Sequence, residues 1–493
     1  MSPPRQFPVR RIAALLAGAS LAGAFAPLGI WPLGILCPAV LMYLWQGATP
    51  REAAWLGFWF NVGTFGVGTY WLYISIHVFG EAPIWLALAI MAALVAIMGL
   101  YHALLGYAVA RWLPKEGQLR WLVGLPAAWL LMEWWRGWFL SGFAWLSLGY
   151  SQTDTWLARV SPILGVYGVS AVLLLSAGAL VSLVISRQWK PALAVMVLPW
   201  LAALSVQGID WTRPSGKPVA VAVVQGAIPQ DLKWAEDNRD TTMRLYRNLT
   251  QQAFGTALIV WPEAAPPDLA NNIVDYLREL YSSAHARGSD VVLGITRATD
   301  NGEEYFNSVL ALGETVSWYD KRHLVPFGEF FPVPDFVRSW LRLKNLPYSD
   351  FTAGADNQPP LASGGLKLAA TICYDDAYGS AQLAALREAD VLVNVTNDAW
   401  FGRSGARHQH LQIARMRAIE AGRYMIRAAN DGISAVIGPR GEVVARAPEY
   451  EPYVLRTSVV PRLGLPPYAY IGNFLIVLLA TAGLAVAVLR RNL

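Results

Sequence analysis

Long apolar runs occupy the N-terminal part of the chain and return at its C-terminal end. A helix that crosses a bilayer core about 30 Å thick needs about 20 apolar residues, with some variation through tilt. Eight runs approach this length and predict transmembrane helices: Ile12–Ala26, Ile30–Trp45, Ala53–Ile76, Ile84–Val109, Trp121–Gly137, Ile163–Ile185, Ala192–Val206 and Ile471–Leu489. We therefore expect a multi-pass α-helical membrane protein.

Between the seventh and eighth runs, short β-branched segments alternate with polar helical ones. Strands are predicted at Val219–Val224, Ala257–Trp261, Val291–Ile295, Ser308–Leu312, Val391–Thr396, Ser434–Ile437 and Val454–Ser458, and also from Leu366 up to Cys373. Helices are predicted at Asp237–Phe254, Asn271–Ala286, Ala377–Glu388 and Gln409–Ala421. This alternation predicts an α/β layered domain with its chemistry at strand ends. The expected organisation is a membrane domain at 1–210, a catalytic domain at 217–463, and a last helix with a short tail at 470–493.

Composition supports this division. The chain is 55% hydrophobic and 15% charged, whereas an ordinary soluble protein is about 25% charged. The net charge of +5 comes from scattered loop residues rather than a basic face, so we expect no nucleic-acid partner. Cys37 lies in an apolar run and Cys373 in the polar domain, so we expect no disulfide framework.

Basic residues of the short loops predict the orientation, because cytoplasmic loops hold the excess of Lys and Arg. These residues fall on one side of the predicted helices: Arg5, Arg10, Arg11, Arg51, Arg111, Lys115, Arg120, Arg187, Lys190, Arg490 and Arg491. Both termini are then cytoplasmic, and the polar domain lies outside. In a bacterium this is the periplasmic face of the inner membrane.

Two features of the apolar region have alternative interpretations. Arg10 and Arg11 precede an apolar core, and the residues 24–26 resemble a cleavage site, so the first run is also compatible with a signal peptide. Glu133 and Arg136 have i,i+3 spacing on the fifth run. They form either an interfacial ion pair or a polar wall where a lipid headgroup enters.

Three candidate catalytic residues follow strands of the polar domain. Glu263 follows Trp261-Pro262, Lys321 follows Tyr319-Asp320, and Cys373 ends the strand that begins at Leu366. A thiol with an ordinary pKa of about 8.5 needs a base to take its proton and a cation to favour the thiolate. Glu263 and Lys321 meet these needs, and Lys321 with the backbone N–H of Tyr374 would stabilise an oxyanion.

The alternatives for these residues remain open at this point. A single cysteine is often a small buried hydrophobe, and an isolated Glu or Lys is usually solvated surface. His323 and His410 also allow a Cys-His arrangement, but one shares the Lys321 loop and the other opens a predicted helix.

The settings of the three residues resemble the nitrilase superfamily of carbon-nitrogen hydrolases: Trp261-Pro262-Glu263, the stretch from Lys321 to Glu329, and Cys373-Tyr374-Asp375. Eight passes around such a domain resemble its membrane-embedded branch, the apolipoprotein N-acyltransferases of bacterial inner membranes. Further matching motifs are Val224–Gln230, Lys233-Trp234, Tyr305–Ser308, Asn397–Gly402, Gln409–Arg417, Asn430–Ile433, Gly142–Trp145 and Gly149–Gln152.

The resemblance implies a four-layer αββα sandwich inserted before the last helix. It implies Glu263 as general base, Lys321 as oxyanion stabiliser and Cys373 as nucleophile, supported by Glu329 and Tyr374. The implied substrate-binding positions are Trp145, Trp234, Asp375, Asn397, Trp400 and Phe401.

The reaction implied is acyl transfer in two steps, without metal or organic cofactor. Cys373 takes the sn-1 acyl chain of a phospholipid as a thioester and passes it to the α-amine of diacylglyceryl-cysteine in an apolipoprotein. The expected partners are therefore this phospholipid donor, the modified apolipoprotein and membrane lipids. The apolar segment Phe327–Trp340, with Phe330, Phe331 and Phe336, is expected to form either a lid or ordinary packing.

Two departures from the family pattern are visible: Asp375 stands where Glu is frequent, and Ala144 where Pro is frequent. Two other functions also fit part of the pattern. A membrane-tethered amidase for a small substrate would need only one anchor, whereas the chain has eight apolar runs. A transporter would need buried charges for an ion pathway, and these are few in the apolar runs.

Overall fold

The computed structural model describes residues 6–186, 189–330 and 351–492. The chain forms two compact units. The helical unit comprises Met1–Asp210, Phe401–Met416 and Tyr470–Leu493, and the sheet unit comprises Trp211–Trp400 and Arg417–Ala469. Each unit is described by itself below.

An α-helix overlaps each of the eight ranges in which a membrane helix was predicted. These are α1 (Gln6–Leu21), α2 (Leu33–Leu44), α3 (Pro50–Gly68), α4 (Ile84–Trp112), α5 (Leu125–Arg136), α6 (Ser161–Ser186), α7 (Trp189–Ser205) and α14 (Phe474–Leu489). Among the described residues, two helical stretches, Ile84–Trp112 and Trp156–Ser186, are long and apolar enough to cross a membrane. That the chain crosses the membrane eight times therefore stays a prediction.

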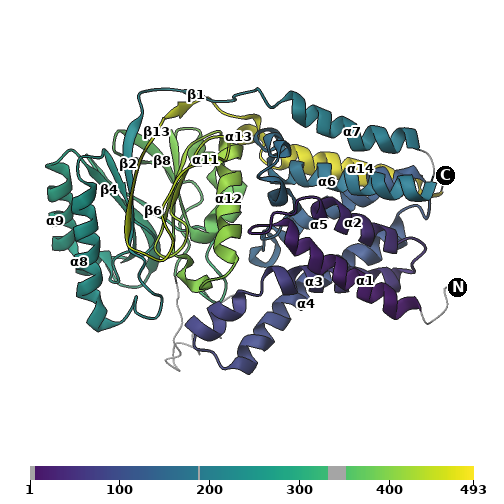
Figure 1. Cartoon of the computed structure of the whole chain (residues 1–493), viewed down its shortest axis with the longest axis horizontal. Coiled ribbons are helices and arrows are strands. Elements are labelled where there is room, and N and C mark those ends of the chain that lie inside the picture. Colours follow the sequence, from purple (N-terminus) through teal and green to yellow (C-terminus); the bar gives the residue numbers. More distant parts are fainter. Residues whose placement is uncertain (1–5, 187–188, 331–350, 493) are drawn as a thin grey trace. The chain divides into compact units, whose positions relative to one another are not determined.

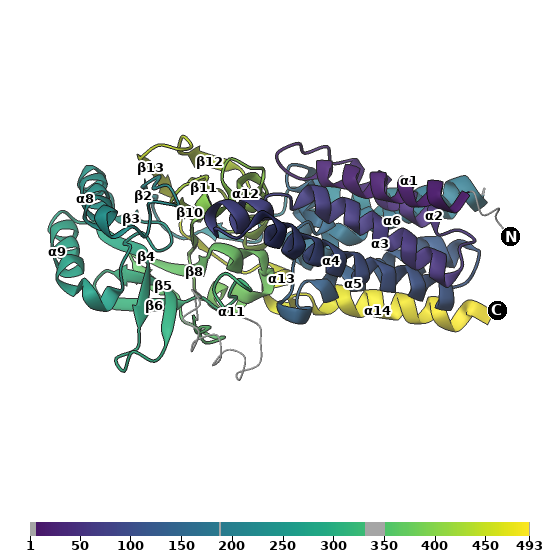
Figure 2. The ribbon, with the colours of Figure 1, turned by 90° about the horizontal axis from the view of Figure 1, so that it is seen from below.

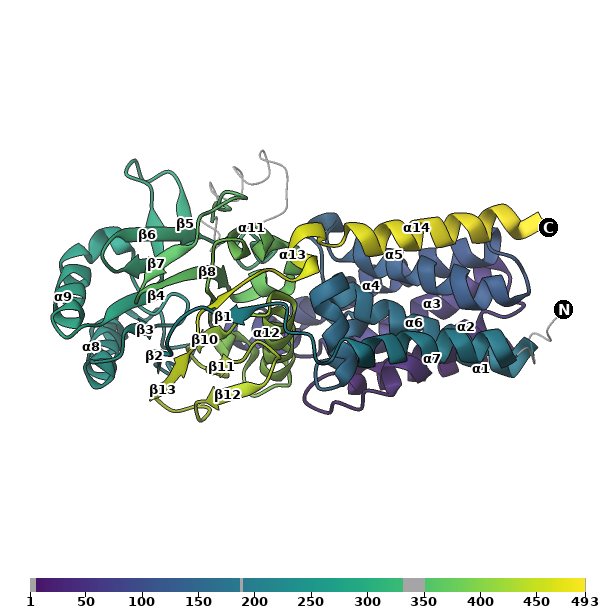
Figure 3. The same ribbon diagram turned by 90° about the horizontal axis from the view of Figure 1, so that it is seen from above.

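Small residues allow the helices of this unit to pack closely. A Cβ on Gly57 of α3 would lie 2.1 Å from the carbonyl oxygen of His102 on α4, and a Cβ on Gly106 of α4 would lie 2.2 Å from that of Ala53. Such close approach of backbones is typical of helices that associate in a membrane. Figures 2 and 3 both show α14 beside α5, which these two helices' contacts bear out.

Glu133 and Arg136 of α5 are both buried, and they hold the loop that follows the helix. Arg136 donates hydrogen bonds to the carbonyl oxygens of Phe143 (2.7 Å) and Trp145 (2.8 Å). Glu133 accepts from Leu148 N (3.1 Å) and from the Ser170 hydroxyl (2.5 Å). Both side chains therefore bind the loop that follows α5, and a contact with a lipid headgroup stays a prediction.

The segment Phe401–Met416 belongs to the helical unit although it follows a strand of the sheet unit in sequence. The Gln409 side-chain oxygen accepts hydrogen bonds from the indole N–H groups of Trp145 (2.7 Å) and Trp71 (3.2 Å). Gln409 Nε2 donates to the carbonyl oxygen of Gly68 (3.3 Å). The oxygen and the nitrogen of the Gln409 side-chain amide thus both bind residues of the helical unit and fix this segment there.

The sheet unit contains two six-stranded sheets. One has the order β13-β2-β3-β4-β5-β6 and the other β12-β11-β10-β9-β8-β7. The strands of the first are β2 (Val219–Gln225), β3 (Leu258–Val260), β4 (Asp290–Ala298), β5 (Tyr305–Leu312), β6 (Val316–Asp320) and β13 (Tyr453–Val459). Those of the second are β7 (Leu361–Ser363), β8 (Leu366–Ile372), β9 (Val391–Thr396), β10 (Met425–Ala429), β11 (Ala435–Ile437) and β12 (Val443–Arg446). A short antiparallel pair joins β1 (Arg213–Pro214) to β14 (Arg462–Leu463).

The main core lies between the two sheets. It is built largely from β-branched and leucine residues such as Val223, Val260, Leu368 and Val393, which are fully buried. The middle strands β8, β9 and β10 run parallel and are almost entirely buried, as expected for parallel strands covered on both faces.

Helices cover the outer faces of the sheets. A second core packs α8 (Glu236–Ala253) and α9 (Val274–His285) against the first sheet. The buried residues of α8 recur at helical spacing, which is the pattern of an amphipathic helix. They include Met243, Tyr246, Leu249 and Ala253. Figure 1 shows α11 (Leu383–Leu386) and the C-terminal end of α12 (Ala406–Ala421) on the other side of the strands, so the layers are α, β, β, α.

One predicted helix is wrong. The segment 377–388 forms a 3₁₀ turn, Gly379–Gln382, and the four-residue α11, and another 3₁₀ turn, Cys373–Ala377, precedes it. Gly379 lies near the start of this segment, and glycine is about 1 kcal/mol less favourable than alanine inside a helix. The long helix that was predicted after Cys373 is therefore replaced by short turns.

Candidate active site

Glu263, Lys321 and Cys373 lie just after strands of the two facing sheets. Glu263 follows β3, Lys321 follows β6 and Cys373 follows β8. Lys321 Nζ lies 3.5 Å from Glu263 Oε1, and the charges of both residues act on the Cys373 thiol. The strand ends thus bring together the three groups that the sequence singled out.

A second glutamate and an asparagine complete a buried polar cluster. Lys321 Nζ donates to Glu329 Oε1 at 2.8 Å. Asn307 Nδ2 donates to Glu263 Oε1 (2.7 Å) and to Glu329 Oε1 (2.9 Å). Val325 N donates to Glu329 Oε2 at 2.8 Å. Two carboxylates are therefore held near one ammonium and one amide, with their positions fixed from several directions.

Lys321 remains charged in this cluster. Its side chain is almost completely buried, and burial acts to lower its pKa. The nearby carboxylates of Glu329 and Glu263 outweigh burial and hold the pKa of the Lys321 ammonium above its ordinary value. A permanent cation at this position can stabilise a developing oxyanion.

The loops after the strands place these side chains through unusual backbone conformations. Cys373 has a φ of 49° and Ala264, next to Glu263, has a φ of 44°. Non-glycine residues adopt this left-handed region rarely, and such strain is frequent at functional sites. A Cβ on Gly294 of β4 would lie 2.5 Å from Glu263 Cα, so only glycine lets the turn that contains Glu263 approach this strand.

Cys373 is half-buried and its thiol is protonated at rest. Burial and the Glu263 carboxylate raise its pKa, while the Lys321 ammonium and a hydrogen bond with Thr396 act in the opposite direction. The net shift is upward. Because the thiolate is the nucleophilic form of a cysteine, a nucleophilic Cys373 would depend on a base that takes its proton as it reacts. Glu263 and Asp398 are the carboxylates whose charges act on this thiol.

Asp375, expected to contact substrate, is fully buried. It accepts hydrogen bonds from His323 N (2.7 Å), the Tyr319 hydroxyl (3.1 Å) and Ile372 N (3.2 Å). These bonds connect the Lys321 loop to the Cys373 turn. Asp375 thus joins the two segments, and its contact with substrate stays a prediction.

Both candidate histidines, His323 and His410, contact aromatic rings. The His323 ring stacks on Tyr378 with centroids 4.1 Å apart, and Tyr378 contacts Tyr374 edge-on at 5.3 Å. His410 belongs to the helical unit, where its ring lies 5.5 Å from that of Trp145.

The other predicted substrate-binding residues fall into three groups. Trp234 and Trp400 are partly exposed in the sheet unit. Asn397 is buried, where it donates to Gln230 (2.8 Å) and accepts from Asn430 (3.1 Å). Trp145 and Phe401 lie in the helical unit, 6.4 Å apart by ring centroids. Of the predicted lid Phe327–Trp340, the part from Phe331 onward, with Phe336, lies outside the described residues.

Two residues of the cluster were not predicted as site residues, although both lie in motifs that matched the family. Asn307 lies inside β5, and Lys233 lies in the loop before α8. Lys233 Nζ donates to the main-chain oxygen of Glu263 at 3.1 Å. The motif Tyr305–Ser308 contains Asn307 and could have drawn attention to it, but the pattern of residues alone does not reveal its role.

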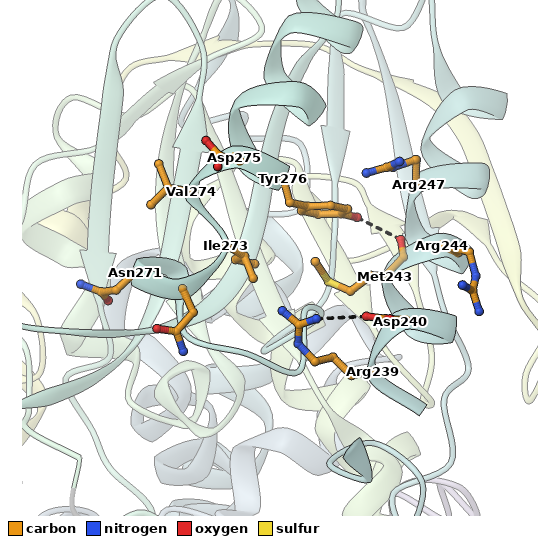
Figure 4. Close-up of a pocket in the computed structure, with 11 residues that line it drawn as sticks. Arg239, Asp240, Met243, Arg244, Arg247, Asn271, Ile273, Val274, Asp275 and Tyr276 are labelled. Carbon is orange, nitrogen blue, oxygen red and sulfur yellow. Dashed lines mark hydrogen bonds and ion pairs between the residues drawn. The ribbon is translucent and has the colours of Figure 1, made fainter. Parts of the chain in front are cut away.

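A cavity of about 480 Å³ lies away from these residues in the sheet unit, between α8 and α9. Figure 4 shows Arg239 beside Asp240, and the Tyr276 hydroxyl directed at the main chain of Met243. Arg239 also pairs with Asp268 (2.6 Å) and Arg247 with Glu279 (3.0 Å). None of the predicted site residues lines this cavity. Within the described parts of the chain, no group of three or more His, Cys, Asp or Glu side chains is arranged to hold a metal ion.

Comparisons with known proteins agree with this geometry. The family model described as "Apolipoprotein N-acyltransferase N-terminal domain" matches residues 17–179, and "Carbon-nitrogen hydrolase" matches residues 220–462. The nitrilase-like fold predicted for the polar domain is thereby confirmed.

Relatives match over nearly the whole chain. An apolipoprotein N-acyltransferase of Methylococcus capsulatus is 40% identical over 94% of this chain and 92% of that protein. One of Pseudomonas putida is 40% identical over 92% of each. A solved carbon-nitrogen hydrolase of Helicobacter pylori G27 is 20% identical, covering 49% of this chain and 88% of that one with a TM-score of 0.37. The chain therefore belongs to the apolipoprotein N-acyltransferase family, as its motifs predicted, and is an acyltransferase.

Proposed function

We propose that this acyltransferase moves the sn-1 acyl chain of a phospholipid, through a thioester on Cys373, to the α-amine of diacylglyceryl-cysteine in apolipoproteins. The observation that supports it most is the cluster of Glu263, Lys321 and Glu329 beside the Cys373 thiol. The names of the relatives supply the class of acceptor.

In the first step, Glu263 takes the proton of the Cys373 thiol, and the sulfur attacks the carbonyl carbon of the ester. The oxyanion that forms is stabilised by the Lys321 ammonium and the Tyr374 N–H. The ester C–O bond then breaks. Glu263 returns the proton to the departing oxygen, which leaves a lysophospholipid and a thioester on Cys373.

In the second step, the neutral α-amine of the acceptor attacks the thioester carbon. Glu263 accepts the proton that the nitrogen loses, and the same oxyanion contacts are used again. The C–S bond breaks, the sulfur regains its proton, and the acyl chain remains on the nitrogen as an amide. A thioester is a suitable intermediate because one difficult step becomes two easier ones.

We place this chemistry at the periplasmic face of a bacterial inner membrane. Residues 217–463 form the catalytic domain, and the regions 1–210 and 470–493 are its membrane part, with both termini cytoplasmic. Both substrates have acyl chains, and exposing such a chain to water costs about 0.8 kcal/mol per CH₂. An enzyme embedded in the bilayer avoids this cost.

The test is a complete reaction with purified protein in mixed micelles. Phospholipid labelled in either the sn-1 or the sn-2 chain is combined with a synthetic diacylglyceryl-cysteine peptide, and the peptide is analysed by mass spectrometry. We expect amide-linked label only from the sn-1 chain, together with one lysophospholipid per amide.

The matched control is a peptide whose α-amine is acetylated. It should accept no chain, because its nitrogen is not nucleophilic. Equal transfer from the sn-2 chain, or labelling of the acetylated peptide, would contradict the proposed donor position or acceptor group.

A further inference from the structure

Lys233 is a second buried lysine of the site, and the steps proposed above do not use it. It lies in the loop between β2 and α8 and is 2% exposed. Within the part of the chain that the structure describes, its one hydrogen bond is from Nζ to the main-chain oxygen of Glu263, at 3.1 Å. Its ammonium also lies 5.9 Å from the Trp234 ring centroid.

The two lysines differ in their partners. Lys321 Nζ lies between the carboxylates of Glu263 and Glu329, which keep it charged. Lys233 is bonded to a neutral carbonyl. Burial lowers its pKa to about 8, although the negative charges of Glu263 and of the Cys373 thiolate both act to raise it. Lys233 therefore changes its charge just above neutral pH, whereas Lys321 does not.

Burying a lysine without a carboxylate partner is costly and therefore rare. The position of Lys233 suggests what offsets this cost. Its bond fixes the carbonyl of Glu263 one residue before the strained Ala264, while Gly294 closes the other side of the same turn. The groups that face Lys233 from the other elements are Glu263 after β3 and Cys373 after β8.

We propose that Lys233 is a positioning residue of the reaction: its bond to the main-chain oxygen of Glu263 fixes the turn that contains this residue, and its positive charge favours the Cys373 thiolate. This inference rests on the proposed function for its role in catalysis. The charge acts on the thiol whether or not a phospholipid is the donor.

The experiment measures the rate of Cys373 alkylation by iodoacetamide from pH 6 to pH 10, using intact mass in a background where Cys37 is replaced by Ala. An opposite charge nearby lowers a pKa by about 1 to 3 units. In Lys233→Met, the rate should therefore fall by about tenfold below pH 8, where Lys233 is charged, and approach that of wild type above pH 8. Lys233→Arg, whose charge is permanent, should match wild type below pH 8 and react faster than wild type above it.

The matched control is Lys367→Met, which removes an exposed lysine from β8, the strand that ends at Cys373. Its profile should overlay that of wild type. A Lys233→Met profile identical to wild type would overturn the inference. If that variant does not fold, Lys233→Arg decides, because an unchanged profile above pH 8 would overturn it equally.

A parallel measurement separates this inference from the proposed function. Each variant is incubated with phospholipid, and the acyl adduct on Cys373 is followed with pH. If wild type forms no adduct while the alkylation profiles shift as stated, the proposed function fails and the role of Lys233 stands. If adducts form in all variants with the same pH dependence, the proposed function stands and the role of Lys233 fails.

Discussion

At the scale of the residue, the site depends on one cation shared by two carboxylates. Lys321 Nζ lies 2.8 Å from Glu329 and 3.5 Å from Glu263, and Asn307 Nδ2 bonds both glutamates. Removal of one partner from such a buried cluster leaves uncompensated charge, which costs several kcal/mol. The same cation is also the proposed oxyanion stabiliser.

We predict that Lys321→Met lowers the rate of acylation of Cys373 by about 10²- to 10³-fold, as expected for the loss of one oxyanion donor. Single-turnover acylation followed by intact mass measures this rate. Lys367→Met serves as the matched control and should acylate at the wild-type rate. A Lys321→Met variant that is folded and acylates normally would show that the assigned role is wrong.

The residues that could be predicted share one property. Glu263, Lys321 and Cys373 each follow an apolar strand, and strand ends are where α/β proteins place their chemistry. Asn307 lies within a strand, and Lys233 lies in a loop where a lysine is ordinarily solvated. Their roles depend on contacts with Glu263 and Glu329, which are distant in the sequence, and no local pattern contains such contacts.

At the scale of the element, the prediction of strands and helices failed at short segments of mixed composition. Val391–Thr396 was predicted with the bounds that β9 has. The strands β1, β6, β7, β10, β12 and β14 were missed, and each is a short segment that contains a polar residue. The segment 377–388 is rich in Ala, which favours a helix, but Gly379 near its start lowers that preference, and only the four-residue α11 forms.

The contact between α8 and the start of α9 depends on Asp268. Its carboxylate accepts from Arg239 Nε (2.7 Å), Leu269 N (2.7 Å) and Asn272 Nδ2 (2.9 Å). Burial acts to raise the pKa of Asp268, but the bonds from Asn272 and Arg239 outweigh it and hold the pKa below its ordinary value.

A carboxylate with a lowered pKa in the folded state stabilises the protein above its unfolded pKa of about 3.9 and loses this effect as pH falls through the folded pKa. We predict that Asp268→Asn lowers the free energy of unfolding by about 1 kcal/mol at pH 7, a small value because the site is partly solvated. The difference in thermal midpoint from wild type should shrink toward pH 3. A difference that stays constant between pH 7 and pH 3 would contradict this account.

At the scale of the whole molecule, the proposed orientation requires the catalytic domain and the loops rich in Lys and Arg to lie on opposite sides of the membrane. The excess of Lys and Arg in one set of loops is the basis for this orientation. Loop charge predicts the orientation because cytoplasmic loops hold the excess of Lys and Arg, and the orientation of this chain stays a prediction. Loop charge does not predict which segments pack together, as the place of Phe401–Met416 in the helical unit illustrates.

We predict opposite labelling of two cysteines introduced into a variant that lacks Cys37 and Cys373. Asp275→Cys lies on the exposed start of α9, and Lys115→Cys lies in an exposed loop after α4. In intact spheroplasts, a membrane-impermeant maleimide should label position 275 and leave position 115 unlabelled until the cells are lysed. Labelling of position 115 with protection of position 275 would reverse the orientation.

The central claim is that Cys373 holds the acyl chain covalently between donor and acceptor. The most direct measurement is the intact mass of the purified protein after incubation with phospholipid and without an acceptor, compared with that of Cys373→Ala. The account predicts a mass increase of one acyl chain that hydroxylamine removes, present in the wild type and absent from the variant. An adduct that persists in Cys373→Ala, or no adduct in a wild-type protein that still acylates the acceptor peptide, would contradict it.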